Sequence, residues 1–262
     1  MTYNPKARFT KPKLFYPESD GQPMADNTLQ FEYIVKIKTN LEILYREREV
    51  FVAGDLFWYP VEGKPRIVVA PDVIVAFDRP KGYRASYKQW EEDDKVPDVV
   101  FEVLSQSNTA LEMLRKKNFY EYHGVQEFII IDPYQYELAA YTRQENKLEE
   151  VEIEENSWHS ECLGITIKKA KETMNFYFPD GQSFHTPEEW NELFKQEKEE
   201  KQKALQQAAQ ERSEKKQALQ QAEQERLEKK QALQQAEQER SEKESALQEI
   251  EKLKAELAKL QQ

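Results

Sequence analysis

The sequence predicts an α/β fold in which a mixed β-sheet is flanked by helices and followed by a long C-terminal helix. Two observations support this prediction. Apolar runs at residues 97–105 and 127–133 flank a segment of helical periodicity at 107–124, and the composition changes abruptly near Thr186. A strand–helix–strand order favours parallel strands, and hairpin patterns elsewhere add antiparallel ones, so the sheet should be mixed.

The segments before residue 97 predict one helix and two strands. Residues 25–47 have the periodicity of an amphipathic helix, whereas 49–63 and 66–77 are rich in the β-branched and aromatic residues of strands. Residues 81–95 are predicted as a loop, with or without a short helix. The apolar face of the helix consists of Leu29, Tyr33, Ile37, Leu41 and Leu44.

The segments after residue 105 predict a helix and two hairpins. Ser107 or Asn108 is expected to cap the helix and Gly124 to end it, because short polar residues and glycine are typical of these positions. Residues 136–151 resemble a hairpin at the edge of the sheet. Residues 176–184 resemble another, which turns at a Pro-Asp-Gly sequence.

The last part of the chain is predicted to form a helical tail. Thr186 suits a helix cap and Pro187 the first turn, and neither glycine nor proline occurs after Pro187. A 14-residue pattern recurs at 203–216, 217–230 and 231–244. One heptad position of this pattern alternates leucine and arginine, at Leu205, Arg212, Leu219, Arg226, Leu233, Arg240 and Leu247.

The repeat is compatible with two interpretations. Glutamate–lysine pairs four residues apart, such as Glu211 and Lys215, stabilise a lone solvated helix. The apolar spacing from Ile250 to Leu260 instead favours a weak coiled coil, through which two chains would form a homodimer.

Composition limits the classes of function. The formal net charge of −11 excludes a protein that coats nucleic acid with a basic face, although a local basic cleft is compatible with it. The single Cys162 forms no internal disulfide, and no apolar run has the length of a membrane span. Residues 1–21 are polar and interrupted by prolines, unlike a signal peptide. We therefore expect a cytoplasmic protein without a membrane partner.

Two carboxylates are the main candidates for chemistry. Glu102 lies inside an apolar strand, where an uncompensated charge is costly, and Asp72 stands at the head of another. If the two strands are neighbours, the carboxylates converge and attract a hard divalent cation such as Mg²⁺, which can activate water and stabilise a phosphodiester transition state. The alternatives are a buried pair of Glu102 with a basic side chain, and a turn role for Asp72.

The same residues resemble a known family. Pro71-Asp72, followed by Glu102 in a strand before a helix, is similar to the pattern of the PD-(D/E)XK nuclease superfamily. The longer strings "PDVVFEVLSQSNT" and "EFIIIDP", with Lys116, Tyr120, Gly124 and Val125 between them, resemble its Uma-two branch of restriction-endonuclease-like proteins. The resemblance covers about residues 22 to 190.

The change in composition and the resemblance together predict three parts of the chain. They are an N-terminal extension at 1–25, a restriction-endonuclease-like domain at 26–185 and the coiled-coil-prone tail at 186–262.

The resemblance also implies roles for individual residues. Asp72 and Glu102 would be the metal ligands, for Mg²⁺ or Mn²⁺. The superfamily places a lysine two residues after the acidic strand residue, but this chain has a leucine there. Lys116 in the following helix is the implied replacement, with Lys117 as the second choice. Glu32 in the first helix is a further carboxylate of a kind that some members use.

Two functions remain open at this point. The first is a Mg²⁺-dependent endonuclease that hydrolyses phosphodiester bonds of duplex DNA. The second is a nuclease fold with weak or no activity that serves as a binding or scaffold module through its helical tail. The acidic charge and the missing strand lysine favour the second function, and the presence of both carboxylates favours the first.

Overall fold

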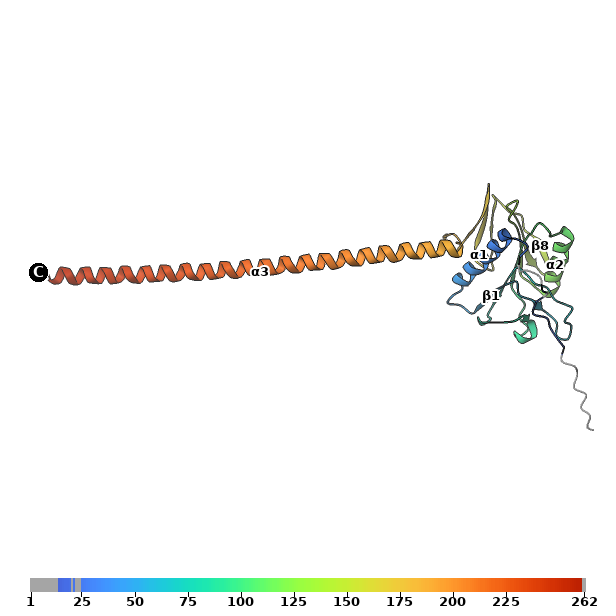
Figure 1. Ribbon diagram of the computed structural model, residues 1–262, viewed down its shortest axis with the longest axis horizontal. Helices are drawn as coiled ribbons and strands as arrows, with labels where there is room; N and C mark the ends of the chain where they lie inside the picture. The colour runs from blue at the N-terminus through green and yellow to red at the C-terminus, as the bar shows by residue number, and fades with distance from the viewer. Residues whose placement is uncertain (1–13, 20, 22–24, 261–262) are drawn as a thin grey trace, which may run out of the picture. The chain divides into compact units, whose positions relative to one another are not determined.

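The structure is a computed structural model, and it describes residues 14–19, 21 and 25–260. The chain divides into two units, residues 1–191 and 192–262. The first unit confirms the predicted fold class, because a mixed sheet packs between helices α1 (Thr28–Leu44) and α2 (Ala110–His123) (Figure 1). The predicted N-terminal extension lies largely outside the described residues.

The central sheet has six strands in the order β1-β3-β5-β6-β7-β8. β5 and β6 are parallel and are joined by α2, as the strand–helix–strand pattern predicts, and the other neighbours are antiparallel. Helix α1 packs on β1, β3 and β5 on one face, and α2 packs against the other face. The strands are β1 (Val50–Gly54), β3 (Val73–Phe77), β5 (Val99–Val103), β6 (Glu127–Asp132), β7 (Glu137–Gln144) and β8 (Lys147–Glu150).

Each face of the sheet has its own apolar core. Successive side chains of a strand point to opposite faces, so in β5 Phe101 packs towards α1 and Val100 towards α2. All five residues of β5 are buried for this reason. Glu102 shares the α2 face with Val100, which places its carboxylate in the core beneath α2.

The buried face of α1 differs from the predicted one. Gln30 and Asn40 are buried together with Ile34, Ile37 and Leu41, whereas the predicted Leu29, Tyr33 and Leu44 are only half-buried. The stripe is rotated because both amides form hydrogen bonds with backbone groups of other segments, which offsets the cost of burying them.

Two smaller sheets were not predicted. A three-stranded sheet in the order β11-β10-β9 joins the core on the α1 side, and a parallel pair joins β2 to β4. The predicted second hairpin is short: residues 176–178 and 182–184 pair through one antiparallel bridge, between Tyr177 and Ser183, and the chain turns between them at the predicted Pro-Asp-Gly sequence. The elements are β2 (Trp58–Tyr59), β4 (Tyr87–Lys88), the short 3₁₀ helix Gln89–Glu91, β9 (Ser157–His159), β10 (Thr166–Ala170) and β11 (Thr173–Tyr177).

The start of α2 also differs from the prediction. Thr109 caps the helix, and its side chain accepts a hydrogen bond from the Glu112 amide at 3.2 Å. The predicted caps Ser107 and Asn108 bind other groups of the preceding loop. Gly124 ends the helix as predicted, with a left-handed φ of 98° that favours glycine.

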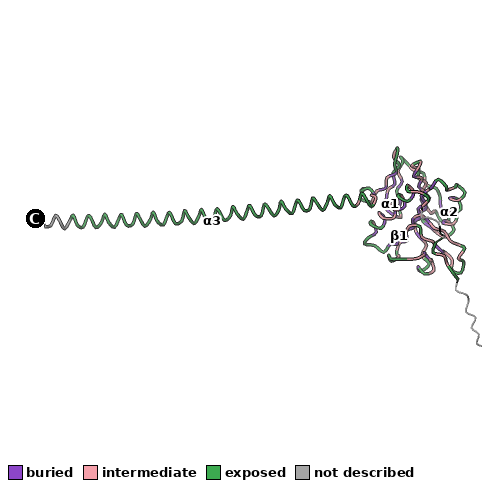
Figure 2. The backbone as a smooth tube through the Cα atoms, in the orientation of Figure 1, coloured by how far each residue is buried: buried purple, intermediate pink, exposed green. Residues whose placement is uncertain are grey.

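The tail is a single helix, α3 (Pro187–Leu260), of 74 residues. Thr186 and Glu189 form a reciprocal capping box, with bonds of 3.2 and 2.7 Å. From residue 191 to residue 254 every residue of α3 is exposed (Figure 2). The side chains of Leu257 and Leu260, part of the predicted coiled-coil end, lie outside the described residues. None of the helices in the described part of the chain is long and apolar enough to cross a membrane.

Asn40 fixes the segment before α3 to α1. Its side chain is fully buried, its Oδ1 accepts bonds from the His185 amide and the Trp190 indole at 3.1 and 2.9 Å, and its Nδ2 donates to the His185 carbonyl at 2.7 Å. One side chain therefore satisfies three polar groups of the segment 185–190.

We expect Asn40→Ala to lower the free energy of unfolding by about 2 kcal/mol, because it leaves buried polar groups unpaired. Chemical denaturation measures the loss. The matched control is Asn118→Ala on the exposed face of α2, which should change it by less than about 0.5 kcal/mol. Equal effects of the two changes would contradict this role of Asn40.

Residues 26–185 are proposed to fold without the tail, and truncation after Phe194 tests this. All four tryptophans precede the cut, so their fluorescence follows the first unit alone. We expect an unchanged thermal midpoint, because the removed residues up to Lys254 are exposed in the full chain. A lower midpoint in the truncated protein would show that the tail stabilises the domain.

Candidate active site

The pairing of β3 with β5 brings the two predicted carboxylates together. The antiparallel register pairs Val73 with Phe101, so one step further Asp72 lies opposite Glu102, and opposed residues project from the same face. The amide of Val103 donates to Oδ2 of Asp72 at 2.6 Å, which fixes this carboxylate beside β5. Both acidic side chains therefore lie on the α2 face of the sheet.

Helix α2 supplies two partners for Glu102. Lys116 and Tyr120 are four residues apart and so lie on one side of the helix. Lys116 Nζ is 2.7 Å from Oε2 of Glu102, and the Tyr120 hydroxyl donates to Oε1 at 2.5 Å. Because Glu102 is only 2% exposed, these two side chains provide much of the compensation that its buried charge requires.

The charges of the cluster are unbalanced. Burial and the neighbouring charge of Glu102 hold the pKa of Asp72 well above its usual value. Burial also raises the pKa of Glu102, although Lys116 and Tyr120 oppose the rise. Burial would lower the pKa of Lys116, but the charge and hydrogen bond of Glu102 outweigh it, so this pKa lies above its usual value. One ammonium thus faces two carboxylates.

Two other predicted residues lie apart from this cluster. Glu32 is exposed on α1. Lys117 points elsewhere, since its Nζ is 3.3 Å from Oε2 of Glu121 and lies over the ring of Tyr141. The structure therefore brings together Asp72, Glu102 and Lys116, and leaves Glu32 and Lys117 outside.

Sequence reasoning missed Gln30, which supports the cluster from the other side of the sheet. Its Nε2 donates to the carbonyl of Val103 at 2.9 Å, and its Oε1 accepts from the amide of Asp26 at the same distance. The Asp26 carboxylate in turn accepts bonds from the hydroxyls of Ser105 and Ser107. A signal for Gln30 was present, because it precedes Ile34 and Ile37 at helical spacing.

The two carboxylates of the cluster have the donor atoms that a divalent ion such as Mg²⁺ prefers. Both provide hard oxygen donors, and the charge of Glu102 disfavours the charged form of Asp72. Mg²⁺ commonly binds through one or two carboxylates while keeping several waters. Within the described residues, no group of three or more His, Cys, Asp or Glu side chains could hold a metal ion. Water would therefore have to complete the coordination.

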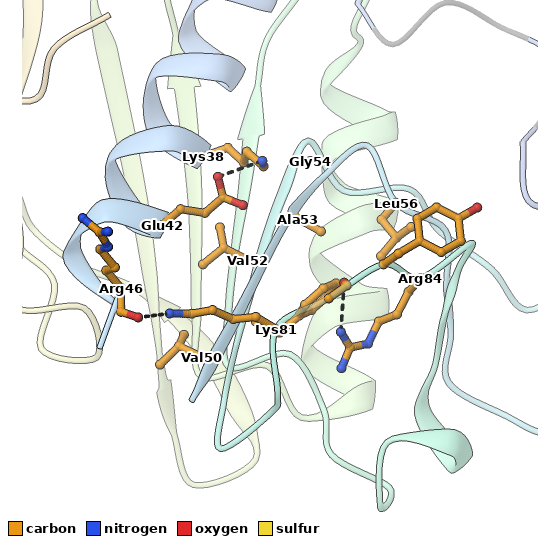
Figure 3. A pocket seen from close by; sticks show the side chains of 13 residues that line it. Lys38, Glu42, Arg46, Val50, Val52, Ala53, Gly54, Leu56, Lys81 and Arg84 are labelled. Carbon is orange, nitrogen blue, oxygen red and sulfur yellow. Dashed lines mark hydrogen bonds and ion pairs between the residues drawn. The ribbon is translucent and has the colours of Figure 1, made fainter. Parts of the chain in front are cut away.

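A groove of about 610 Å³ runs along β1, the edge strand of the sheet (Figure 3). α1 forms one wall and residues 81–84 form the other. At the end of β1 the groove reaches Gly54, and the next amide, of Asp55, donates to the carbonyl of Asp72 at 3.2 Å. Positive charge is in excess among the charged lining residues, which are Lys38, Glu42, Arg46, Lys81 and Arg84.

A comparison with protein-family models agrees with the sequence resemblance. A model of the Uma2 family, described as "Putative restriction endonuclease", matches residues 19–169. A crystal structure from Anabaena variabilis ATCC 29413, described as "a putative nuclease belonging to DUF820", is 15% identical over 58% of this chain and 87% of its own, with a TM-score of 0.40. Curated proteins gave no significant match. Because the family model spans more than half of the 262 residues, the chain belongs to the Uma2 family.

Proposed function

We propose that this protein is a metal-dependent nuclease that hydrolyses phosphodiester bonds of duplex DNA. The observation that supports it most directly is the convergence of Asp72 and Glu102 beside the ammonium of Lys116. Family membership supports the broader class of nuclease. The metal, the DNA substrate and the roles of these residues are part of the proposal.

Asp72 and Glu102 would hold one Mg²⁺ or Mn²⁺. When bound, the ion would lower the pKa of a coordinated water and stabilise the charge of the phosphate. Lys116 would stabilise the negative charge that develops on the phosphate oxygens. Tyr120 fixes the orientation of Glu102, and the amide of Val103 fixes that of Asp72.

The groove along β1 is the proposed contact for the DNA backbone. It ends beside Asp72, and its excess of basic side chains contrasts with the net charge of −11. All four cations also have local partners. Lys81 donates to the carbonyl of Tyr45 and Arg84 pairs with Glu92. Lys38 pairs with Glu42 at 2.8 Å, and Arg46 lies 3.8 Å from the exposed Glu47. Arg46, with 84% of its side chain exposed, is the cation most available to a phosphate.

Self-association through α3 would suit a duplex substrate. Two domains joined by their tails would provide two sites for the two strands, and the exposed leucines of the repeat offer a limited apolar seam. The competing proposal is a binding module without activity, in which the tail provides the function. The single cysteine is consistent with the reducing cytoplasm, where we place the protein.

We expect Asp72→Asn to abolish plasmid cleavage with Mg²⁺ or Mn²⁺ while leaving the thermal midpoint in EDTA unchanged or higher. The amide oxygen can still accept the bond from Val103, and a carboxylate that is unfavourably placed beside Glu102 is removed. Glu102→Gln is a less clean test because it leaves Lys116 unpaired. The matched control is Asp180→Asn in an exposed turn, which should cleave like the wild type. If Asp72→Asn cleaves the plasmid as fast as the wild type does, Asp72 is not a catalytic ligand.

We expect the double change Lys38→Ala/Arg46→Ala to weaken DNA binding and to reduce the salt dependence of the affinity by about 0.9 in log–log slope for each lost phosphate contact. Fluorescence anisotropy with a labelled duplex in Ca²⁺ or EDTA measures both. Lys168→Ala/Lys169→Ala, at exposed positions of β10, removes the same charge and should bind like the wild type. If both double variants lose the same DNA affinity, the protein binds DNA through its overall charge and not through this groove.

A further inference from the structure

Both oxygens of the Glu102 carboxylate are occupied. Tyr120 donates to Oε1 and Lys116 to Oε2, at 2.5 and 2.7 Å, and the side chain is 2% exposed. A divalent ion could not bind Glu102 in this arrangement without sharing or replacing one of the two donors. If the ion replaces a donor, the site changes at one of these two contacts.

Lys116 is the donor that an ion would replace. Tyr120 is fully buried among apolar groups such as Val100 and Phe128, which leaves its hydroxyl little freedom. The Lys116 side chain is 21% exposed and can swing towards solvent. Its ammonium also repels a dication, whereas the neutral hydroxyl does not.

Lys116 lies where its ammonium can take the place of a metal ion. Its ammonium bonds to Glu102 and also interacts electrostatically with Asp72, so it acts on the same two carboxylates that would hold an ion. When both carboxylates are ionised and Lys116 is in place, the three charges sum to −1. A dication that displaced it would neutralise both carboxylates and leave the ammonium outside the coordination sphere.

We propose that Lys116 is the counter-cation of the metal-free site, and that a divalent ion binds by displacing its ammonium from Oε2 of Glu102. This inference rests on the proposed metal-dependent function. It adds a second role for Lys116, which holds the carboxylates in place before metal binds and becomes available to a phosphate only afterwards. Metal affinity is then set by a competition between the two cations for one oxygen.

Binding of Mn²⁺ without DNA tests the competition. Free Mn²⁺ is measured by electron paramagnetic resonance during titration of the full chain, for the wild type and for Lys116→Gln, which keeps a neutral hydrogen-bond donor next to Glu102. We expect Lys116→Gln to bind Mn²⁺ about tenfold more tightly, because a repelling charge is lost. Lys117→Gln removes the same charge one residue away and should bind like the wild type, and Glu102→Gln should lose binding.

Thermal unfolding provides a second measurement. Lys116→Gln should have a lower midpoint than the wild type in EDTA, and Mn²⁺ should raise its midpoint by more than that of the wild type. An affinity for Mn²⁺ in Lys116→Gln that equals or falls below that of the wild type would overturn the competition while leaving the metal site intact. If none of the four proteins binds Mn²⁺, the proposed function and this inference both fail.

Discussion

The buried charge of Glu102 is the constraint on which much of the domain depends. A carboxylate in the middle of a fully buried strand needs partners, and α2 supplies them by placing Lys116 and Tyr120 on one side of the helix. The polar cluster thus fixes how α2 sits on the sheet, in addition to the apolar contacts around it. Packing and the candidate chemistry therefore share Glu102 and Lys116.

The position of the lysine separates this chain from the common superfamily pattern. A lysine in β5 two residues after Glu102 would project from the same face of the strand. Here the ammonium reaches that carboxylate from the neighbouring helix, 14 residues later. Because the Lys116 side chain reaches the carboxylate from a helix and is partly exposed, its ammonium has more freedom to move than that of a lysine on the buried strand would have.

Sequence patterns predicted the centre of the fold better than its margins. The apolar runs around Glu102 and at 127–133 identified two adjacent strands, because burial on both faces leaves a continuous apolar signal. β9 and β10 were missed because they are short and partly exposed, and β10 contains two lysines. The helical spacing of Gln30 with Ile34 and Ile37 indicated its burial but not its partner, because the carbonyl of Val103 is 73 residues away and no local pattern reports such a contact.

The pairing of β3 with β5 also bears on how the domain avoids misfolding. A slip of one residue in β5 would turn every side chain to the opposite face and move Glu102 from Lys116 into the apolar layer around Ile34 and Ile37. A buried charge without a partner makes that alternative register far less stable than the native one. The carboxylate proposed for catalysis therefore also selects the correct strand alignment, so its loss would relax the specificity of folding as well as remove a ligand.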